Sequence, residues 1–262
     1  MNQKEQKLVE LLVSMQKKYG ILGVKAEFEA EGARLEELMR LKDIASRAGM
    51  GIALKIGGPE AISDILRARL VGVAEIVAPM VESSYALLKF LDAFNKHVRE
   101  DERVHVIPAV NIETIQSYRD LDKILEVGKA KGLHGVTVGR VDLVGSMGLG
   151  RKDANSHEIF EITKTICEKA KNAGMRTVVG GSIEKESEEF IKKLVGANLL
   201  DRFETRKIIF DAKLALKDYK SAVKDAHRFE DGWLENKRDH YQRIADEDKE
   251  RIPMLKKRIT EE

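Results

Sequence analysis

Residues 104–114, Val-His-Val-Ile-Pro-Ala-Val-Asn-Ile-Glu-Thr, and residues 136–148, Val-Thr-Val-Gly-Arg-Val-Asp-Leu-Val-Gly-Ser-Met-Gly, share one pattern. In each, a β-branched run typical of a buried strand is followed by a carboxylate, Glu113 or Asp142, where a loop is expected. An apolar strand has no packing reason to end on a carboxylate. Two carboxylates on successive strands of a parallel barrel can converge on one divalent cation, so the pair predicts a Mg²⁺ site. Taken alone, Glu113 could equally cap the helix that begins near Thr114.

The bulk composition restricts the class of protein. A chain of 262 residues suffices for one large α/β domain or two small ones. Its net charge of +2 predicts neither nucleic-acid nor membrane binding. The single cysteine, Cys167, excludes an internal disulfide, and its helical setting favours a core thiol over a nucleophile. No signal-peptide pattern or apolar membrane span is present, so we expect a cytoplasmic protein.

Strand and helix patterns alternate through most of the chain. An amphipathic helix over residues 3–19 comes first. The expected strands are 22–29, 51–56, 75–79, 104–110, 134–138 and 176–179, with weaker candidates at 198–203 and 206–210. This order predicts a parallel sheet, and its length favours a closed (β/α)8 TIM barrel, an α/β fold, over residues 1–210. The position of the eighth strand stays open.

The tail, residues 211–262, has a different composition. It is charged and helical, with the isolated aromatic residues Trp233 and Tyr241. It could be an exposed tail, but the aromatic residues favour a helical C-terminal arm that packs on a neighbouring subunit. We therefore expect the arm to leave its own barrel.

Barrel enzymes carry their active sites at the carboxyl ends of the strands. The polar residues at those positions are Glu29, Lys55, Glu82, Glu113, Asp142, Gly180, Gly181, Ser182 and Arg202 or Glu204, with Arg140 nearby. We expect Arg140 and the segment Gly180-Gly181-Ser182 to bind substrate. Free backbone N–H groups in the glycine segment could hold a carboxylate or phosphate, although glycine pairs also form plain turns.

Lys55 stands alone on an apolar strand and therefore needs a partner. It could contact a substrate oxygen, form an ion pair with Glu29 or Glu27, or form a Schiff base, which would require a depressed pKa. Lys25, Glu27 and Glu29 alternate along the first strand and share one face. We interpret Glu27 as a partner of Lys25 and Glu29 as a catalytic candidate.

These segments resemble the HpcH/HpaI aldolase and citrate lyase beta-chain family. The resemblance rests on residues 52–60, on Ile-Val-Ala-Pro-Met-Val-Glu at 76–82, on Asn-Ile-Glu-Thr at 111–114, and on Gly-Arg-Val-Asp-Leu at 139–143 with Ser-Met-Gly at 146–148. It implies a phosphoenolpyruvate/pyruvate-type barrel, a Mg²⁺ or Mn²⁺ ion and reversible C–C cleavage through an enolate. It also implies homo-oligomers that exchange C-terminal helices.

Two positions depart from the family pattern. The family's aldolases carry a glutamate-histidine pair after an early strand, where this chain has Glu27-Phe28-Glu29-Ala30-Glu31 and no histidine. The family's arginine on the next strand aligns with Lys55, which cannot make the two-pronged contact of a guanidinium. The substrate differs, another base such as Glu29 acts, or catalysis is reduced.

The sequence thus predicts a metal-dependent carbon–carbon lyase acting on a small 2-keto acid or its aldol adduct. Glu113 and Asp142 would hold the metal, Lys55 would stabilise an oxyanion, and Glu29 or a water would move the proton. The alternatives are an acyl-CoA ester lyase, a non-catalytic barrel of the same family, and a Schiff-base aldolase.

Overall fold

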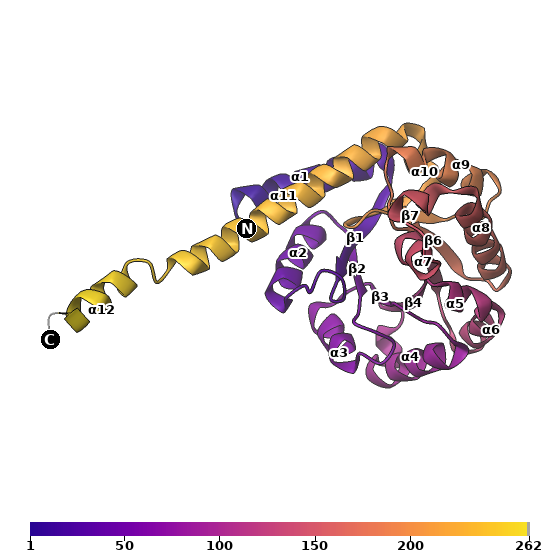
Figure 1. Ribbon diagram of the computed structural model, residues 1–262, viewed down its shortest axis with the longest axis horizontal. Coiled ribbons are helices and arrows are strands. Elements are labelled where there is room, and N and C mark those ends of the chain that lie inside the picture. The colour runs from indigo at the N-terminus through magenta and orange to yellow at the C-terminus, as the bar shows by residue number, and fades with distance from the viewer. Residues whose placement is uncertain (261–262) are drawn as a thin grey trace.

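The computed structural model describes residues 1–260 and contains a closed barrel of eight strands in chain order, ringed by helices (Figure 1). The predicted α/β TIM-barrel class is therefore confirmed. The strands are β1 Ile21–Glu27, β2 Gly51–Lys55, β3 Glu75–Ala78, β4 Ile107–Ile112, β5 Gly135–Gly139, β6 Arg176–Gly180, β7 Arg202–Glu204 and β8 Ile208–Asp211.

The helices follow the predicted alternation through β6. They are α1 Gln3–Tyr19, α2 Leu35–Arg47, α3 Ile62–Val71, α4 Ser84–His97, α5 Ile115–Arg119, α6 Leu121–Lys131, α7 Arg140–Ser146, α8 His157–Asn172, α9 Glu188–Gly196, α10 Ala212–Ala215, α11 Tyr219–Asp246 and α12 Arg251–Thr260. Asn2 and Glu5 form a capping box at the start of α1, and Gly20 ends this helix with φ 68°.

The last strand reverses the direction of the sheet. Strands β1 to β7 pair in parallel, but β8 is antiparallel to both of its neighbours, β7 and β1. Only Thr205, Arg206 and Lys207 separate β7 from β8, which leaves no room for a crossover helix, so the two strands form a hairpin. The stacked rings of Phe203 and Phe210, 4.8 Å apart, fix its register. The expectation that all strands run parallel is wrong for this strand.

Several strand boundaries differ from the predicted ones. The clearest case is β4, which begins at Ile107 because the apolar residues before it lie in a turn, where Val104 is 75% exposed. Asp142 lies in the first turn of α7 rather than at the end of β5. Apolarity alone therefore placed these strands to within a few residues.

Most of the hydrophobic core lies between the strands and the surrounding helices. A separate buried cluster contains only Ala53, Val77, Ala109 and Ile209. Glu75 shares a strand face with Val77 and pairs with Arg176 at 2.5 Å. The lysines and carboxylates at the opposite ends of these strands form the candidate site described below.

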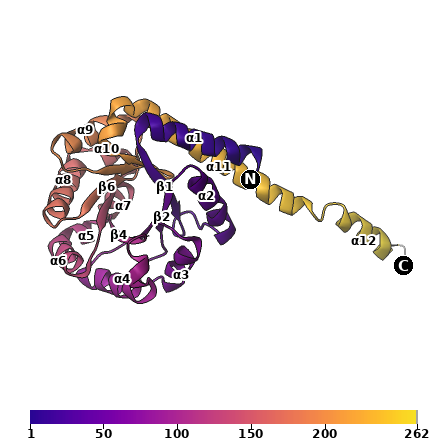
Figure 2. The same ribbon diagram turned by 180° about the vertical axis from the view of Figure 1, so that it is seen from behind.

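The tail packs on its own barrel for most of its length, contrary to the prediction. Helix α11 runs alongside α1 (Figures 1 and 2), where Tyr19 donates a hydrogen bond to Asp225 at 2.9 Å. Trp233 is buried in the same core as α1. Tyr241 donates to Glu37 of α2 at 2.6 Å.

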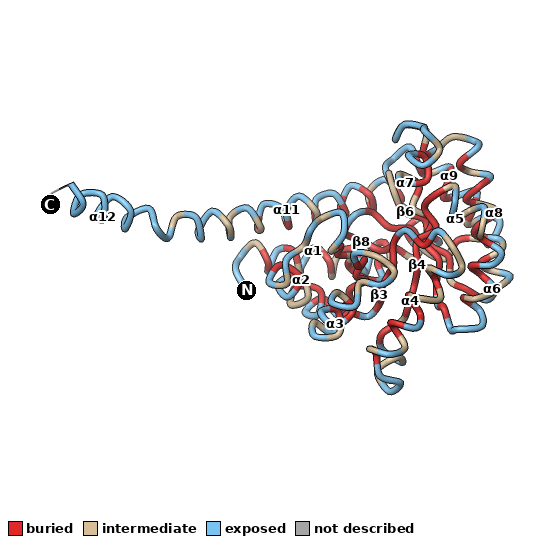
Figure 3. Tube along the Cα trace, turned by 60° about the horizontal axis from the view of Figure 1, so that its bottom comes forward, coloured by how far each residue is buried: buried red, intermediate tan, exposed pale blue. Residues whose placement is uncertain are grey.

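Only the distal part of the arm extends away from the barrel (Figure 3). The end of α11 and all of α12 are largely exposed. The arm therefore begins some thirty residues later than predicted, because the apolar face of α11 matches that of α1. Among residues 1–260, no helix combines the length and apolarity that crossing a bilayer requires.

Candidate active site

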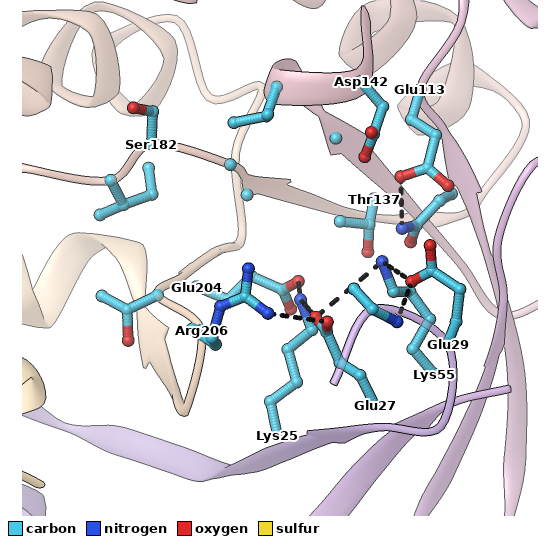
Figure 4. A pocket seen from close by; sticks show the side chains of 18 of the residues that line it. Lys25, Glu27, Glu29, Lys55, Glu113, Thr137, Asp142, Ser182, Glu204 and Arg206 are labelled. Carbon is cyan, nitrogen blue, oxygen red and sulfur yellow. Dashed lines mark hydrogen bonds and ion pairs between the residues drawn. The ribbon is translucent and has the colours of Figure 1, made fainter. Parts of the chain in front are cut away.

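A pocket of about 460 Å³ opens at the carboxyl ends of the parallel strands (Figure 4). Each strand of the sheet except β3 and β8 supplies lining residues directly, and the loops after β1, β5, β6 and β7 add more. The pocket brings together these predicted site residues: Glu29, Lys55, Glu113, Asp142, Gly180, Gly181, Ser182 and Glu204. Glu82 and Arg202 do not line it; Arg202 lies near Glu75, 3.8 Å from its carboxylate.

Glu113 is the most buried carboxylate that lines the pocket, with 1% exposure. One of its oxygens accepts from the N–H of Met80 at 2.9 Å, and the other accepts from the side-chain amide of Asn111 at 2.9 Å. Burial raises the pKa of Glu113, and the charge of Lys55 opposes this rise. The carboxylate rests on Gly139, where an added Cβ would lie 2.5 Å from its Oε2.

Asp142 points into the pocket beside Glu113 (Figure 4). Its negative charge adds to the rise in the pKa of Glu113, for which burial is the main cause. No cluster of three or more His, Cys, Asp or Glu side chains suited to a metal occurs within residues 1–260. Glu113 and Asp142 are thus a neighbouring pair of carboxylates rather than part of a larger cluster of that kind.

Lys55 is 6% exposed and pairs with Glu29 at 2.9 Å, while Glu27 lies 3.9 Å away. Burial lowers the pKa of Lys55, but the charges of Glu27 and Glu113 outweigh it, so the net shift is upward. This ammonium group stays protonated, and a Schiff-base lysine would need the opposite shift.

Lys25 lies deeper in the pocket and joins two carboxylates. Its ammonium is 2.9 Å from Glu27 and 2.7 Å from Glu204. The predicted pairing of Lys25 with Glu27 is thus observed. Glu204 packs against Gly180, where an added Cβ would lie 3.1 Å from its side chain.

Carboxylates outnumber cations in the pocket. Seven Asp and Glu side chains line it against four Lys and Arg side chains, an excess of three negative charges. The carboxylates are Glu27, Glu29, Glu113, Asp142, Glu184, Glu204 and Glu230. This excess favours a bound cation.

Arg140, which was predicted to bind substrate, faces the protein interior rather than the pocket. Its side chain is fully buried outside the pocket lining. Its guanidinium donates to the carbonyls of Gly180, Gly181 and Ser182 at 3.3, 2.7 and 3.1 Å, and to Asn155 at 2.7 Å. Burial lowers the pKa of Arg140 to about 10. Arg140 therefore holds the glycine segment in place from behind.

Sequence reasoning missed several lining residues: Asn111, Thr137, Arg151, Arg206, His227 and Glu230. Asn111 had a usable signal, since it stands two residues before Glu113 in the same motif and so shares its strand face. His227 and Glu230 come from α11, and only the packing of the arm on its own barrel brings them to the mouth.

Residues 38–195 match the HpcH/HpaI aldolase/citrate lyase family, and the chain belongs to that family. Family membership supports an aldolase- or lyase-type enzyme. No curated protein matches the chain.

Three solved structures share the fold. Citrate synthase SbnG is 16% identical with a TM-score of 0.61, over 86% of this chain and 90% of that chain. The HpcH/HpaI aldolase from Desulfitobacterium hafniense DCB-2 is 13% identical with a TM-score of 0.60, over 74% of this chain and 80% of that chain. An HpcH/HpaI aldolase/citrate lyase family protein from Burkholderia cenocepacia J2315 is 14% identical with a TM-score of 0.60, over 85% and 90%. At these identities the likeness concerns the fold alone.

Proposed function

We propose that the chain is a divalent-metal-dependent carbon–carbon lyase that forms or cleaves a bond through a pyruvate-type enolate. The observation that carries this proposal is the convergence of Glu113, Asp142 and Lys55 on one pocket at the carboxyl ends of the barrel strands. The substrate would be a small 2-keto acid or its aldol adduct.

Glu113 and Asp142 suit a hard cation such as Mg²⁺ or Mn²⁺, because both offer carboxylate oxygens. The raised pKa of Glu113 and the excess of carboxylates both mark a place where positive charge would be stabilising. A bound divalent ion would act as a Lewis acid toward the keto and carboxylate oxygens of the substrate. Met80 and Asn111 hold Glu113 in position for this role.

Lys55 provides a fixed positive charge near the developing oxyanion, because its raised pKa keeps it protonated. Glu29, at 2.9 Å from Lys55, is the candidate base that takes a proton from the substrate carbon and returns it. Glu29 would thus act in place of the histidine that the family's aldolases carry and this chain lacks.

The segment Gly180–Ser182 is proposed to hold the substrate carboxylate. Gly181 and Ser182 adopt φ values of 75° and 52°, and Arg140 binds the carbonyls of both residues. With the carbonyls held from behind, the N–H groups of this turn are available to an anion in the pocket.

Deuterium exchange at the methyl group of pyruvate tests the proposal without knowledge of the second half of the substrate. In D₂O with Mg²⁺, NMR should show that the methyl proton signal is lost. The signal should persist in EDTA. The loss should resume when Mg²⁺ or Mn²⁺ is added back. Glu113→Gln should abolish the exchange. Glu82→Gln removes an exposed carboxylate outside the pocket and should retain it. Undiminished exchange in EDTA would overturn the metal route, and borohydride trapping would then test Lys55 as an imine.

We also propose that the distal arm packs on a second copy of the chain. Ile252, Leu255 and Ile259 share one side of α12, and all are exposed. An apolar helix face of this kind gains stability when another surface covers it.

A further inference from the structure

The turn of the β7–β8 hairpin contacts the loop that follows β1. This loop, residues 28–34, carries the candidate base Glu29. We propose that Lys207, in the hairpin turn, is a positioning residue that holds the loop through Glu31 so that Glu29 stays against Lys55. The catalytic part of this inference rests on the proposed function, whereas its mechanical part does not.

The central contact is an ion pair between Lys207 and Glu31. The two side chains are 2.5 Å apart, with side-chain exposures of 3% and 13%. Burial lowers the pKa of Lys207, and the charge of Glu31 opposes this shift. A lysine this enclosed needs its carboxylate partner, so the pair ties the loop to the hairpin more firmly than a surface ion pair would.

Two further contacts anchor the hairpin turn. The N–H of Lys25 donates to the carbonyl of Lys207 at 2.8 Å, which joins the turn to β1. Arg206 lies 3.4 Å from Glu27 and 3.9 Å from Glu31 (Figure 4 shows the Glu27 contact). The turn is thus attached to β1 on one side and to the loop on the other.

The loop has limited support of its own. The N–H of Phe28 donates to the carbonyl of Lys55 at 2.8 Å and fixes the start of the loop. Beyond it, the bonds from Gly32 to Glu29 and from Ala33 to Glu27 are both 3.3 Å long. Glu29 itself is partly exposed, with 31% of its side chain accessible. Segments with few strong contacts open locally, so the position of Glu29 depends on the contact at Glu31.

The reversal of β8 makes this arrangement possible. A parallel eighth strand would need a long crossover connection before it, and no tight turn would then stand beside β1. The hairpin instead places Arg206 in the pocket lining near Glu27 and Glu31, and it places Lys207 against Glu31.

Lys207→Met tests the inference with two readouts. Hydrogen exchange followed by mass spectrometry should show faster exchange in residues 28–34 and no change in residues 51–55. Pyruvate deuteration should fall about 10- to 100-fold in kcat with KM changed less than twofold, because a small misplacement of a catalytic group has effects of this size. Lys207→Arg should restore both readouts in large part.

Two controls keep the test decisive. Lys192→Met removes an exposed lysine of α9 and should alter neither readout. The double variant Glu31→Gln with Lys207→Met leaves no unpaired charge behind, so it should fold and still show fast exchange in the loop.

The outcomes separate the two proposals. Unchanged hydrogen exchange in residues 28–34, both in Lys207→Met and in the double variant, would overturn the positioning role. Faster exchange with unaltered kcat would overturn the link to Glu29. A wild-type protein with no pyruvate deuteration but with a loop that depends on Lys207 would reject the proposed function and retain the mechanical role.

Discussion

Gly139 shows how a residue without a side chain can define a site. Glu113 occupies the space that a Cβ at Gly139 would need, with its own Cβ 2.8 Å and its Oε2 2.5 Å from that position. Gly139→Ala should therefore push the carboxylate out of place and reduce pyruvate deuteration by about 100-fold, while the backbone φ of −87° tolerates alanine. Activity and Mg²⁺ affinity, measured by calorimetry, should fall together.

Gly145→Ala is the matched control for this variant. Gly145 lies in α7, the helix that begins directly after Gly139, and an added Cβ there meets nothing within 4 Å. It should keep full activity and gain up to about 1 kcal/mol of stability, since alanine is the better helix former. Equal activity in both variants would contradict the view that Gly139 makes room for Glu113.

Arg140 should matter for stability. It binds the three consecutive carbonyls of residues 180–182 and stacks on Phe190 with 4.6 Å between its Cζ and the ring centroid. Arg140→Met should lower the free energy of unfolding by about 3 kcal/mol, because several buried carbonyls lose their donor. Denaturant unfolding measures this loss.

Arg67→Met gives the surface reference for that experiment. Arg67 is 56% exposed and, within residues 1–260, pairs only with its helical neighbour Asp64, so the change should stay within about 0.5 kcal/mol. If the two variants were equally stable, the structural role assigned to Arg140 would be wrong.

At the scale of elements, Glu37 connects the arm to the barrel. It accepts from Tyr241 at 2.6 Å and pairs with Lys237 at 3.0 Å, both in α11. Burial raises the pKa of Glu37, but the hydrogen bonds from Tyr241 and Lys237 outweigh it and the net shift is downward. The stabilisation is therefore present above the unfolded pKa of about 4.3 and is lost as the pH falls through the lower folded value.

Glu37→Gln should cost about 1–2 kcal/mol at pH 7, and this difference should vanish in acid below the folded pKa. Thermal or denaturant unfolding across pH 2–7 measures it. Glu36→Gln, at the exposed neighbouring position, should have little effect at any pH. A cost for Glu37→Gln that did not change with pH would show that ionisation of this carboxylate is unimportant.

The sequence predicted the positions of the strands better than it predicted how they pair. Six strands were located to within a few residues, because each is a β-branched run bounded by turn residues. The direction of β8 could not be predicted, since four residues such as Ile208–Asp211 carry no mark of parallel or antiparallel pairing. The tight connection of Thr205–Lys207 was the available signal for a hairpin.

In the candidate site, too, local patterns predicted some contacts, and contacts between distant segments were missed. Alternation along a strand placed Lys25, Glu27 and Lys55 on inward faces, and their observed ion pairs agree with the predicted partners. Arg140 was misjudged because an arginine beside a pocket has the same sequence signature whether it faces the pocket or the carbonyls behind it. Lys207 and Glu31 are 176 positions apart, and no local pattern joins them.

For the whole molecule, the two parts of the arm should behave differently. Removal of residues 247–262 should leave the free energy of unfolding nearly unchanged, because α12 makes no buried contact in the described chain, residues 1–260. It should shift the assembly to smaller species in light scattering, as expected if α12 packs on a second copy.

Truncation before Ala226 is the contrasting variant. It removes Phe229 and Trp233, both buried in the core, at a cost of about 2–3 kcal/mol each, and should unfold the protein. A full-length protein that is monomeric at micromolar concentration would remove the basis for the intersubunit role of the distal arm.

The antiparallel β8 also has a consequence for the order in which the barrel forms. A turn of three residues costs little closure entropy, so the β7–β8 hairpin can form within microseconds. Its pairing with β1 joins Ile21 to Phe210 and so encloses nearly the whole barrel in one loop. That pairing also contains a register shift between Ile21 and Gly23. The β1–β8 pairing thus joins strands that are far apart in the sequence, so we expect it to form late in folding, and the loop bearing Glu29 follows β1 at this boundary.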